Sequence, residues 1–154
     1  MLADELLSAL DDRAEAALKP VFVVVGEESF LIDEVVRRLQ TVTHTGGIHG
    51  FNDDRYVAGE AHVDTVLGAA KSVPMMAKRR FVLVRSLERW EARAGDEGGA
   101  PEPKKGAKGE SPLDRLAAYA ADPSPLCVLV LTANKLHAQR RLMTAAKKGG
   151  FLVA

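Results

Sequence analysis

The sequence has little cysteine, no excess charge of either sign and no long hydrophobic run. Its single cysteine, Cys127, cannot form an internal disulfide and lies in an apolar run, so we expect it to be a small buried hydrophobe. Lys and Arg together number 21 and Asp and Glu also number 21, which gives a formal net charge of zero. Because a domain that coats nucleic acid usually carries a basic excess, DNA binding is not expected to be the main function, although a local basic patch is possible.

Two further features that the sequence lacks bear on where the protein is found in the cell. No apolar stretch approaches the roughly 20 residues that span a bilayer, and the acidic, amphipathic start of the chain is unlike a signal peptide. We therefore expect a cytoplasmic protein with no membrane partner. The 154 residues are the length of one ordinary domain, and 47% of them are hydrophobic, so a core can form without a metal or a disulfide.

Short apolar runs alternate with segments of helical spacing along most of the chain. The predicted strands are 21–25, 51–57, 81–84, 126–131 and 151–153. The predicted helices are 2–18, about 31–39 after an N-cap at Ser29, 61–72, 111–120 with an N-cap at Ser111 and Pro112 at the first helical position, and 138–148. This alternation predicts an α/β fold, with a three-layer parallel sheet of about five strands and helices on both faces. Residues 92–110 contain no large apolar side chain, so we predict a flexible insertion there.

A nucleotide site is predicted to be missing. After the first strand the chain reads Gly26-Glu27-Glu28, which keeps one glycine of a phosphate-binding loop but lacks its second glycine and its lysine. The two carboxylates would repel a triphosphate. Arg85 stands after the third strand, where a magnesium-binding aspartate would be expected. We therefore predict a P-loop-type topology without a functional P-loop, with no cofactor and no metal.

Other catalytic patterns are also missing from the sequence. The four histidines and Cys127 do not have zinc-ligand spacing, and no Gly-x-Ser-x-Gly motif occurs. Asn134, after the fourth strand, resembles a phosphate sensor, but without a phosphate it is more simply a loop or turn residue. We therefore predict no catalytic residues.

The segment from Ser72 to Arg80 is the feature that suggests function. Pro74 ends a helix, and the consecutive Met75 and Met76 cannot share one helical face, so at least one should point away from the core. Methionine is flexible and polarizable, which suits an apolar plug that enters a partner's pocket. The following basic residues, Lys78, Arg79 and Arg80, could steer an acidic partner. Both methionines could equally fill a gap beneath the loop, and the residues alone leave the two interpretations open.

Four segments, in chain order, resemble the delta subunit family of bacterial DNA polymerase III. They are 19–34 (Pro, a hydrophobic strand, Gly-Glu-Glu, Ser, Phe, Leu), 51–52, 72–84 (two bulky apolar residues, a small residue, a basic pair, a strand) and 129–136 followed by 140–143. The resemblance implies an AAA+-like fold that has lost ATP hydrolysis. It also implies that residues 1–154 are the first of three domains and that the later domains are absent from this chain.

The resemblance further implies a function in DNA replication. A family member is a clamp-loader component that binds and helps open the sliding clamp, the beta subunit, without hydrolysing ATP. Its implied partners are gamma/tau and delta prime within a nucleotidyltransferase complex, and it meets DNA through that complex. The clamp-binding residues implied for this sequence are Ser72, Pro74, Met75, Met76, Lys78 and Arg79.

Two alternatives of different classes stay open. A degenerate NTPase or nucleotide transferase would be stabilised against heat by ATP. A DNA-contacting domain would use a basic helix near the end of the chain and would bind DNA with a steep salt dependence. The basic residues concerned are Lys135, Arg140, Arg141, Lys147 and Lys148, whose simpler role is a solvated helix face.

Overall fold

Five strands form one parallel sheet in the part of the chain that the structure describes. The computed structural model describes residues 1–44, 53–74, 78–90, 111–137 and 140–154. The strands are β1 (Val21–Val25), β2 (Asp53–Val57), β3 (Arg80–Arg85), β4 (Cys127–Ala133) and β5 (Leu152–Val153), and their order in the sheet is β2-β3-β4-β1-β5. Every neighbouring pair is parallel, as the alternation of strands and helices predicts.

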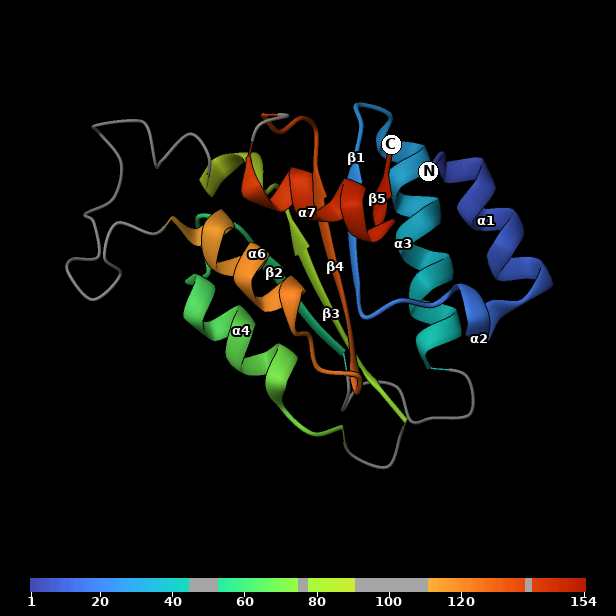
Figure 1. Cartoon of the computed structure of the whole chain (residues 1–154), viewed down its shortest axis with the longest axis horizontal. Coiled ribbons are helices and arrows are strands. Elements are labelled where there is room, and N and C mark those ends of the chain that lie inside the picture. The colour runs from blue at the N-terminus through green and yellow to red at the C-terminus, as the bar shows by residue number, and fades with distance from the viewer. Residues whose placement is uncertain (45–52, 75–77, 91–110, 138–139) are drawn as a thin grey trace.

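Helices cover both faces of this sheet and make three layers (Figure 1). The helices are α1 (Ala3–Asp12), α2 (Ala14–Ala17), α3 (Ser29–Thr43), α4 (Val63–Lys71), α6 (Pro112–Ala121) and α7 (Arg141–Gly149). The buried side chains of α1 and α3 belong to one hydrophobic cluster, and those of α4, α6 and α7 belong to another. The predicted α/β class and its layers are therefore confirmed.

The central strand β4 shows why the apolar runs form strands. All seven of its residues are buried, including Cys127, and they alternate between the two clusters, with Val128 and Val130 on the α3 face and Leu129 and Leu131 on the other face. A parallel strand that is covered on both faces needs a continuous apolar sequence rather than an alternating one. Burial of each such side chain contributes about 1.5–3 kcal/mol to folding.

Several predicted helix ends differ from the structure. The predicted helix 2–18 breaks at Arg13, which has φ −151° and ψ 68° and separates α1 from α2. The prediction of Ser29 as an N-cap is wrong, because Glu28 takes the extended cap conformation and Ser29 is already helical. The predicted cap at Ser111 is confirmed, since its hydroxyl accepts a hydrogen bond from the Asp114 N–H at 3.2 Å.

The ends of α4 and α7 also carry local signals. Helix α4 begins at Val63, two residues after the predicted start, because the Nδ1 atom of His62 accepts the Asp64 N–H at 3.1 Å and caps the helix. Helix α7 ends at Gly149 and is capped by Gly150, whose φ of +75° favours glycine. The predicted insertion 92–110 and the first residues of the predicted strand 51–57 and helix 138–148 lie outside the described residues.

Candidate functional site

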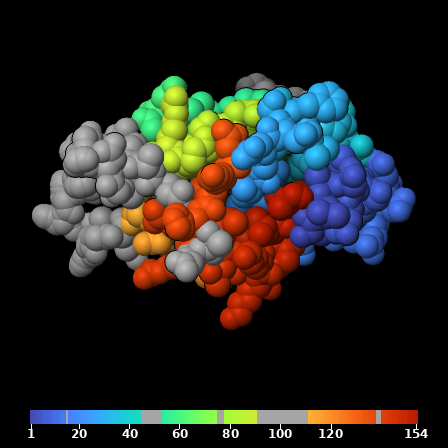
Figure 2. All heavy atoms as spheres, turned by 90° about the horizontal axis from the view of Figure 1, so that it is seen from above, coloured from blue at the N-terminus to red at the C-terminus, as the bar shows by residue number. Residues whose placement is uncertain are grey.

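The carboxyl ends of β1, β3 and β4 meet at the edge where open α/β proteins bind ligands. This carboxyl edge faces the viewer in Figure 2, where the start of α3 is light blue, the end of β3 yellow-green and the segment after β4 orange. The turn after β1 is held against β4, because the Gly26 N–H donates to the Ala133 carbonyl at 3.1 Å. Glu27 and Glu28 are exposed, and Glu28 is the N-cap of α3. The Glu28 side chain makes no cap hydrogen bond, but the negative charges of Glu27 and Glu28 next to the start of α3 disfavour a phosphate there.

Arg85 forms an ion pair at the same edge. Its Nη1 atom donates to Asp33 Oδ1 on α3 at 3.0 Å, and the two side chains are 39% and 61% exposed. The next residue, Ser86, has a φ of 64°, an unusual value for a residue other than glycine, and turns the chain away from β3. Where a magnesium-binding carboxylate would be needed, the structure places a cation that is already paired.

The segment after β4 is tied to the segment after β3. The Asn134 N–H donates to Glu88 Oε1 at 3.1 Å, and the Leu87 N–H donates to the Thr132 carbonyl at 3.0 Å. Asn134 lies in the bend after β4, in agreement with the expected turn residue. Among the described residues, no group of three or more His, Cys, Asp or Glu side chains is placed to hold a metal ion.

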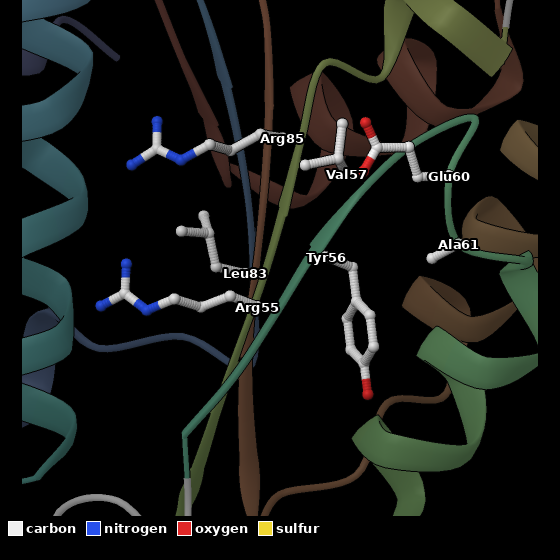
Figure 3. A pocket seen from close by; sticks show the side chains of 7 residues that line it. All are labelled: Arg55, Tyr56, Val57, Glu60, Ala61, Leu83 and Arg85. Atoms are coloured by element: carbon white, nitrogen blue, oxygen red, sulfur yellow. The ribbon is translucent and has the colours of Figure 1, made fainter.

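A hollow of about 350 Å³ lies beside the edge strand β2 (Figure 3). Its lining residues are Arg55, Tyr56, Val57, Glu60, Ala61, Leu83 and Arg85. Arg55, Leu83 and Arg85 point toward α3, whereas Tyr56 points to the opposite side of the strand. Because the polar groups lie on two faces of the sheet, they do not converge on one small ligand.

The opposite edge of the sheet carries the segment that the sequence singled out. We call residues 72–80 the docking segment and the edge where β3 and β4 begin the amino edge. Met75 and Met76 lie outside the described residues, so their placement stays a prediction. Of the other predicted docking residues, Ser72 and Lys78 are exposed, whereas Pro74 and Arg79 are half-buried.

Two exposed apolar side chains, which the sequence analysis did not single out, lie at the amino edge. Val73 is 71% exposed, and Leu126, just before β4, is 43% exposed. The backbone links Leu126 to the end of the docking segment, since the Arg80 N–H donates to the Leu126 carbonyl at 2.8 Å. Leu126 was predicted to be a strand residue, but the strand begins one residue later, at Cys127.

Arg80 is a structural residue at this edge. Its side chain is only 14% exposed, and its Nη2 atom donates to Asp54 Oδ2 on β2 at 2.9 Å. The interpretation that Arg80 steers an acidic partner is therefore wrong, because its charge is matched inside the domain. Lys78 remains exposed and can serve that purpose.

The basic residues predicted for DNA contact lie at two ends of α7. Arg140 is the N-cap and Arg141 the first helical residue, whereas Lys147 and Lys148 occupy the last turn, where the helix dipole favours cations. Arg141, Lys147 and Lys148 are exposed, as is Lys135. Lys147 lies six positions after Arg141 in the helix, which is about 9 Å along the axis. The structure therefore presents these cations as two small groups.

The fold and its edges define the class of protein. A five-stranded parallel sheet in this order, with helices on both faces, makes this a three-layer α/β domain, and the turn after β1 has neither the lysine nor the second glycine of a phosphate-binding loop. The model of the family described as DNA polymerase III, delta subunit, matches residues 22–154. Because this match covers most of the chain, the chain belongs to that family.

Individual relatives agree with this assignment. The DNA polymerase III subunit delta of Bacillus subtilis is 29% identical over 136 residues, which cover 87% of this chain and 36% of that protein. The solved DNA clamp loader delta protein of Bacillus subtilis matches with a TM-score of 0.73 and 24% identity over 99% of this chain and 42% of its own length. A gamma subunit-related DNA polymerase III protein of Thermotoga maritima matches with a TM-score of 0.58 and 17% identity, over 97% of this chain and 45% of its own. The two structural matches show likeness of fold.

The chain spans less than half the length of the relatives that it matches. None of the helices in the described residues is both long enough and apolar enough to cross a membrane.

Proposed function

We propose that this chain is the part of a clamp-loader delta subunit that binds the sliding clamp, the beta subunit, and helps open it without hydrolysing ATP. The observation that carries this proposal is the exposed apolar surface at the amino edge. Val73, at 71% exposure, directly precedes Pro74 and the methionine pair in the docking segment. Family membership supplies the ring-shaped clamp as the partner for this surface.

The energy available from such a contact fits a mechanical role. Burying Met75 and Met76 in an apolar pocket contributes roughly 3–6 kcal/mol before the costs of association. This binding free energy favours an opened clamp only by the difference between its affinities for the open and closed rings. The docking segment would therefore bind the open ring more tightly than the closed one.

The carboxyl edge supports a role without ATP hydrolysis. Glu27 and Glu28 bring two negative charges to the start of α3, and Arg85, which follows β3, is paired with Asp33. ATP would then act through the gamma/tau subunits, and this chain would work beside them and delta prime in the assembled loader.

The clamp-binding proposal is tested by calorimetric titration of the clamp with this chain. The Met75→Ala, Met76→Ala double variant should bind at least about 30-fold more weakly, which corresponds to about 2 kcal/mol. Phe30→Ala is the matched control, because Phe30 is 81% exposed but lies at the carboxyl edge. Unchanged affinity of the double variant would remove the proposal.

A second candidate function is DNA contact through α7, which the exposure of Arg141, Lys147 and Lys148 favours. Its test is the binding of duplex DNA by the chain at a series of salt concentrations. An affinity that falls steeply with salt, and falls less steeply after Lys147→Ala and Lys148→Ala, would support it. We expect weak binding, because the chain has no net positive charge.

A further inference from the structure

Arg80 is bonded to three separate segments of the amino edge. Its Nη2 atom donates to Asp54 Oδ2 on β2 at 2.9 Å, and its Nη1 atom lies 3.5 Å from the carbonyl oxygen of Val73. Its backbone N–H donates to the carbonyl of Leu126 at 2.8 Å. Arg80 therefore contacts the backbone of both exposed apolar residues of this edge. Its side chain contacts Val73 and its backbone N–H contacts Leu126.

The charges of Arg80 and Asp54 are partly removed from water. The side chain of Arg80 is 14% exposed and that of Asp54 28%, so both charges have lost much of their water. The Nε atom of Arg80 is buried without a hydrogen-bond partner within the described residues. Removal of charges from water offsets much of the attraction in such a pair, and an apolar residue can serve stability as well. The advantage of arginine is its planar fork, which fixes the directions of several donors at once.

At the end of α4 the guanidinium of Arg80 meets the backbone that leads into the docking segment. The chain leaves the helix at Ser72 with φ −74° and ψ 151°, and the Ser72 hydroxyl donates back to the Gly68 carbonyl at 2.9 Å. The Val73 carbonyl follows at the negative end of the helix dipole and faces the guanidinium of Arg80. The chain thus leaves α4 at an end that the Ser72 hydroxyl closes, and Arg80 Nη1 lies at the outer hydrogen-bond distance from the Val73 carbonyl oxygen.

Leu126 is fixed by a separate set of bonds. Its N–H donates to the Ser124 hydroxyl at 3.2 Å, and the Ser124 N–H donates to the Tyr119 hydroxyl at 3.1 Å. The turn before β4 is therefore anchored to α6 and, through the Leu126 carbonyl, to Arg80. An exposed apolar side chain on an ordered backbone loses little entropy when a partner covers it.

We infer that Arg80 and Asp54 form a positioning pair for the docking segment and that Leu126 is a second apolar contact for the clamp. Val73 lies at the start of the segment, and Leu126 lies beside its end at Arg80, so the surface offered to the clamp is broader than the methionine pair alone. This inference rests on the proposed function, because the partner that would cover Leu126 is the same sliding clamp.

The contact is tested with Leu126→Ala, measured by calorimetric titration of the clamp. The exposed side chain can be shortened with little effect on folding, and the dissociation constant should rise about fivefold, which corresponds to about 1 kcal/mol. Phe30→Ala, at the other edge, is the control and should leave the affinity unchanged. If Leu126→Ala binds the clamp with wild-type affinity, Leu126 does not contact the clamp.

The positioning pair is tested with a double-mutant cycle on clamp affinity. Arg80→Lys and Asp54→Asn should each weaken binding about tenfold, and the double variant should bind no worse than either single one, because the residues act as a unit. The control pair is Arg115 with Asp64, which joins the first turns of α6 and α4. Arg115→Lys should change the urea midpoint but leave clamp affinity unchanged. If the losses of binding free energy in the two single variants add up in the double variant, or if Arg80→Lys binds the clamp like the wild type, Arg80 and Asp54 do not act as a positioning pair.

The failure of this inference can be told apart from the failure of the proposed function. If the Met75→Ala, Met76→Ala variant loses binding while Leu126→Ala and Arg80→Lys bind like the wild type, the inference is wrong and clamp binding stands. If the methionine double variant keeps wild-type affinity, the proposed function is wrong and the inference falls with it.

Discussion

The thiol of Cys127 makes the domain sensitive to alkaline pH in a way that can be calculated. Burial raises the pKa of Cys127 from its ordinary value of 9.0 to about 12, while nearby Arg80 lowers it and Asp54 raises it. Above pH 9 the unfolded chain loses this proton and the folded chain keeps it, so the free energy of unfolding falls as the pH rises from 9 toward 12. At pH 10 the loss is about 1.4 kcal/mol, since one pKa unit corresponds to that energy.

The assay is urea unfolding at pH 8 and pH 10 for the wild type and for Cys127→Ala. Tyrosines and lysines also titrate in this range, but they are present in both proteins and cancel in the difference. Loss of the sulfur destabilises the variant by an amount that does not depend on pH. The gap in unfolding free energy between the two proteins should therefore shrink by about 1.4 kcal/mol between the two pH values. A gap that stays constant would refute the reasoning.

Three further predictions follow from the fold and the two edges. Leu129→Ala, at a fully buried position in the central strand, should lower the free energy of unfolding by about 2.7–5.0 kcal/mol in a urea titration, and a loss below about 1 kcal/mol would contradict its place in the core. Tyr119→Phe removes the hydroxyl that accepts the Ser124 N–H and should cost about 1–2 kcal/mol in the same titration, whereas no loss would show that this bond is dispensable. ATP with magnesium should leave the melting temperature unchanged because Glu27 and Glu28 repel phosphate at the start of α3 and the turn after β1 has no phosphate-binding lysine, and a rise of several degrees would support the nucleotide-binding alternative.

The sheet could be predicted because its strands carry strong local signals. The run from Cys127 to Leu131 is apolar at every position, and such a run fits a parallel strand that is covered on both faces. The cap at Ser111, followed by Pro112, is an equally local signal. The break at Arg13 has no such signal, because the apolar spacing continues across it, and a histidine is not a usual cap, which explains the missed start of α4.

The site was only partly predictable, because part of it depends on contacts between distant segments. The basic run Lys78-Arg79-Arg80 does not reveal which cation is buried, and that depends on Asp54, which lies 26 residues earlier in the chain. The exposure of Leu126 depends on the residue at which β4 begins, and apolar spacing does not locate that residue. The absence of a phosphate-binding loop, in contrast, could be read directly from Gly26-Glu27-Glu28.

The most direct test of the account is site-specific photo-crosslinking from position 76. A photoreactive amino acid in place of Met76, irradiated in a mixture with the purified clamp, reports by mass spectrometry which residues lie within reach. The account predicts crosslinks to apolar residues of the clamp, and none from a photoreactive amino acid at position 30. Crosslinks from position 76 only to the interior of this domain would contradict it.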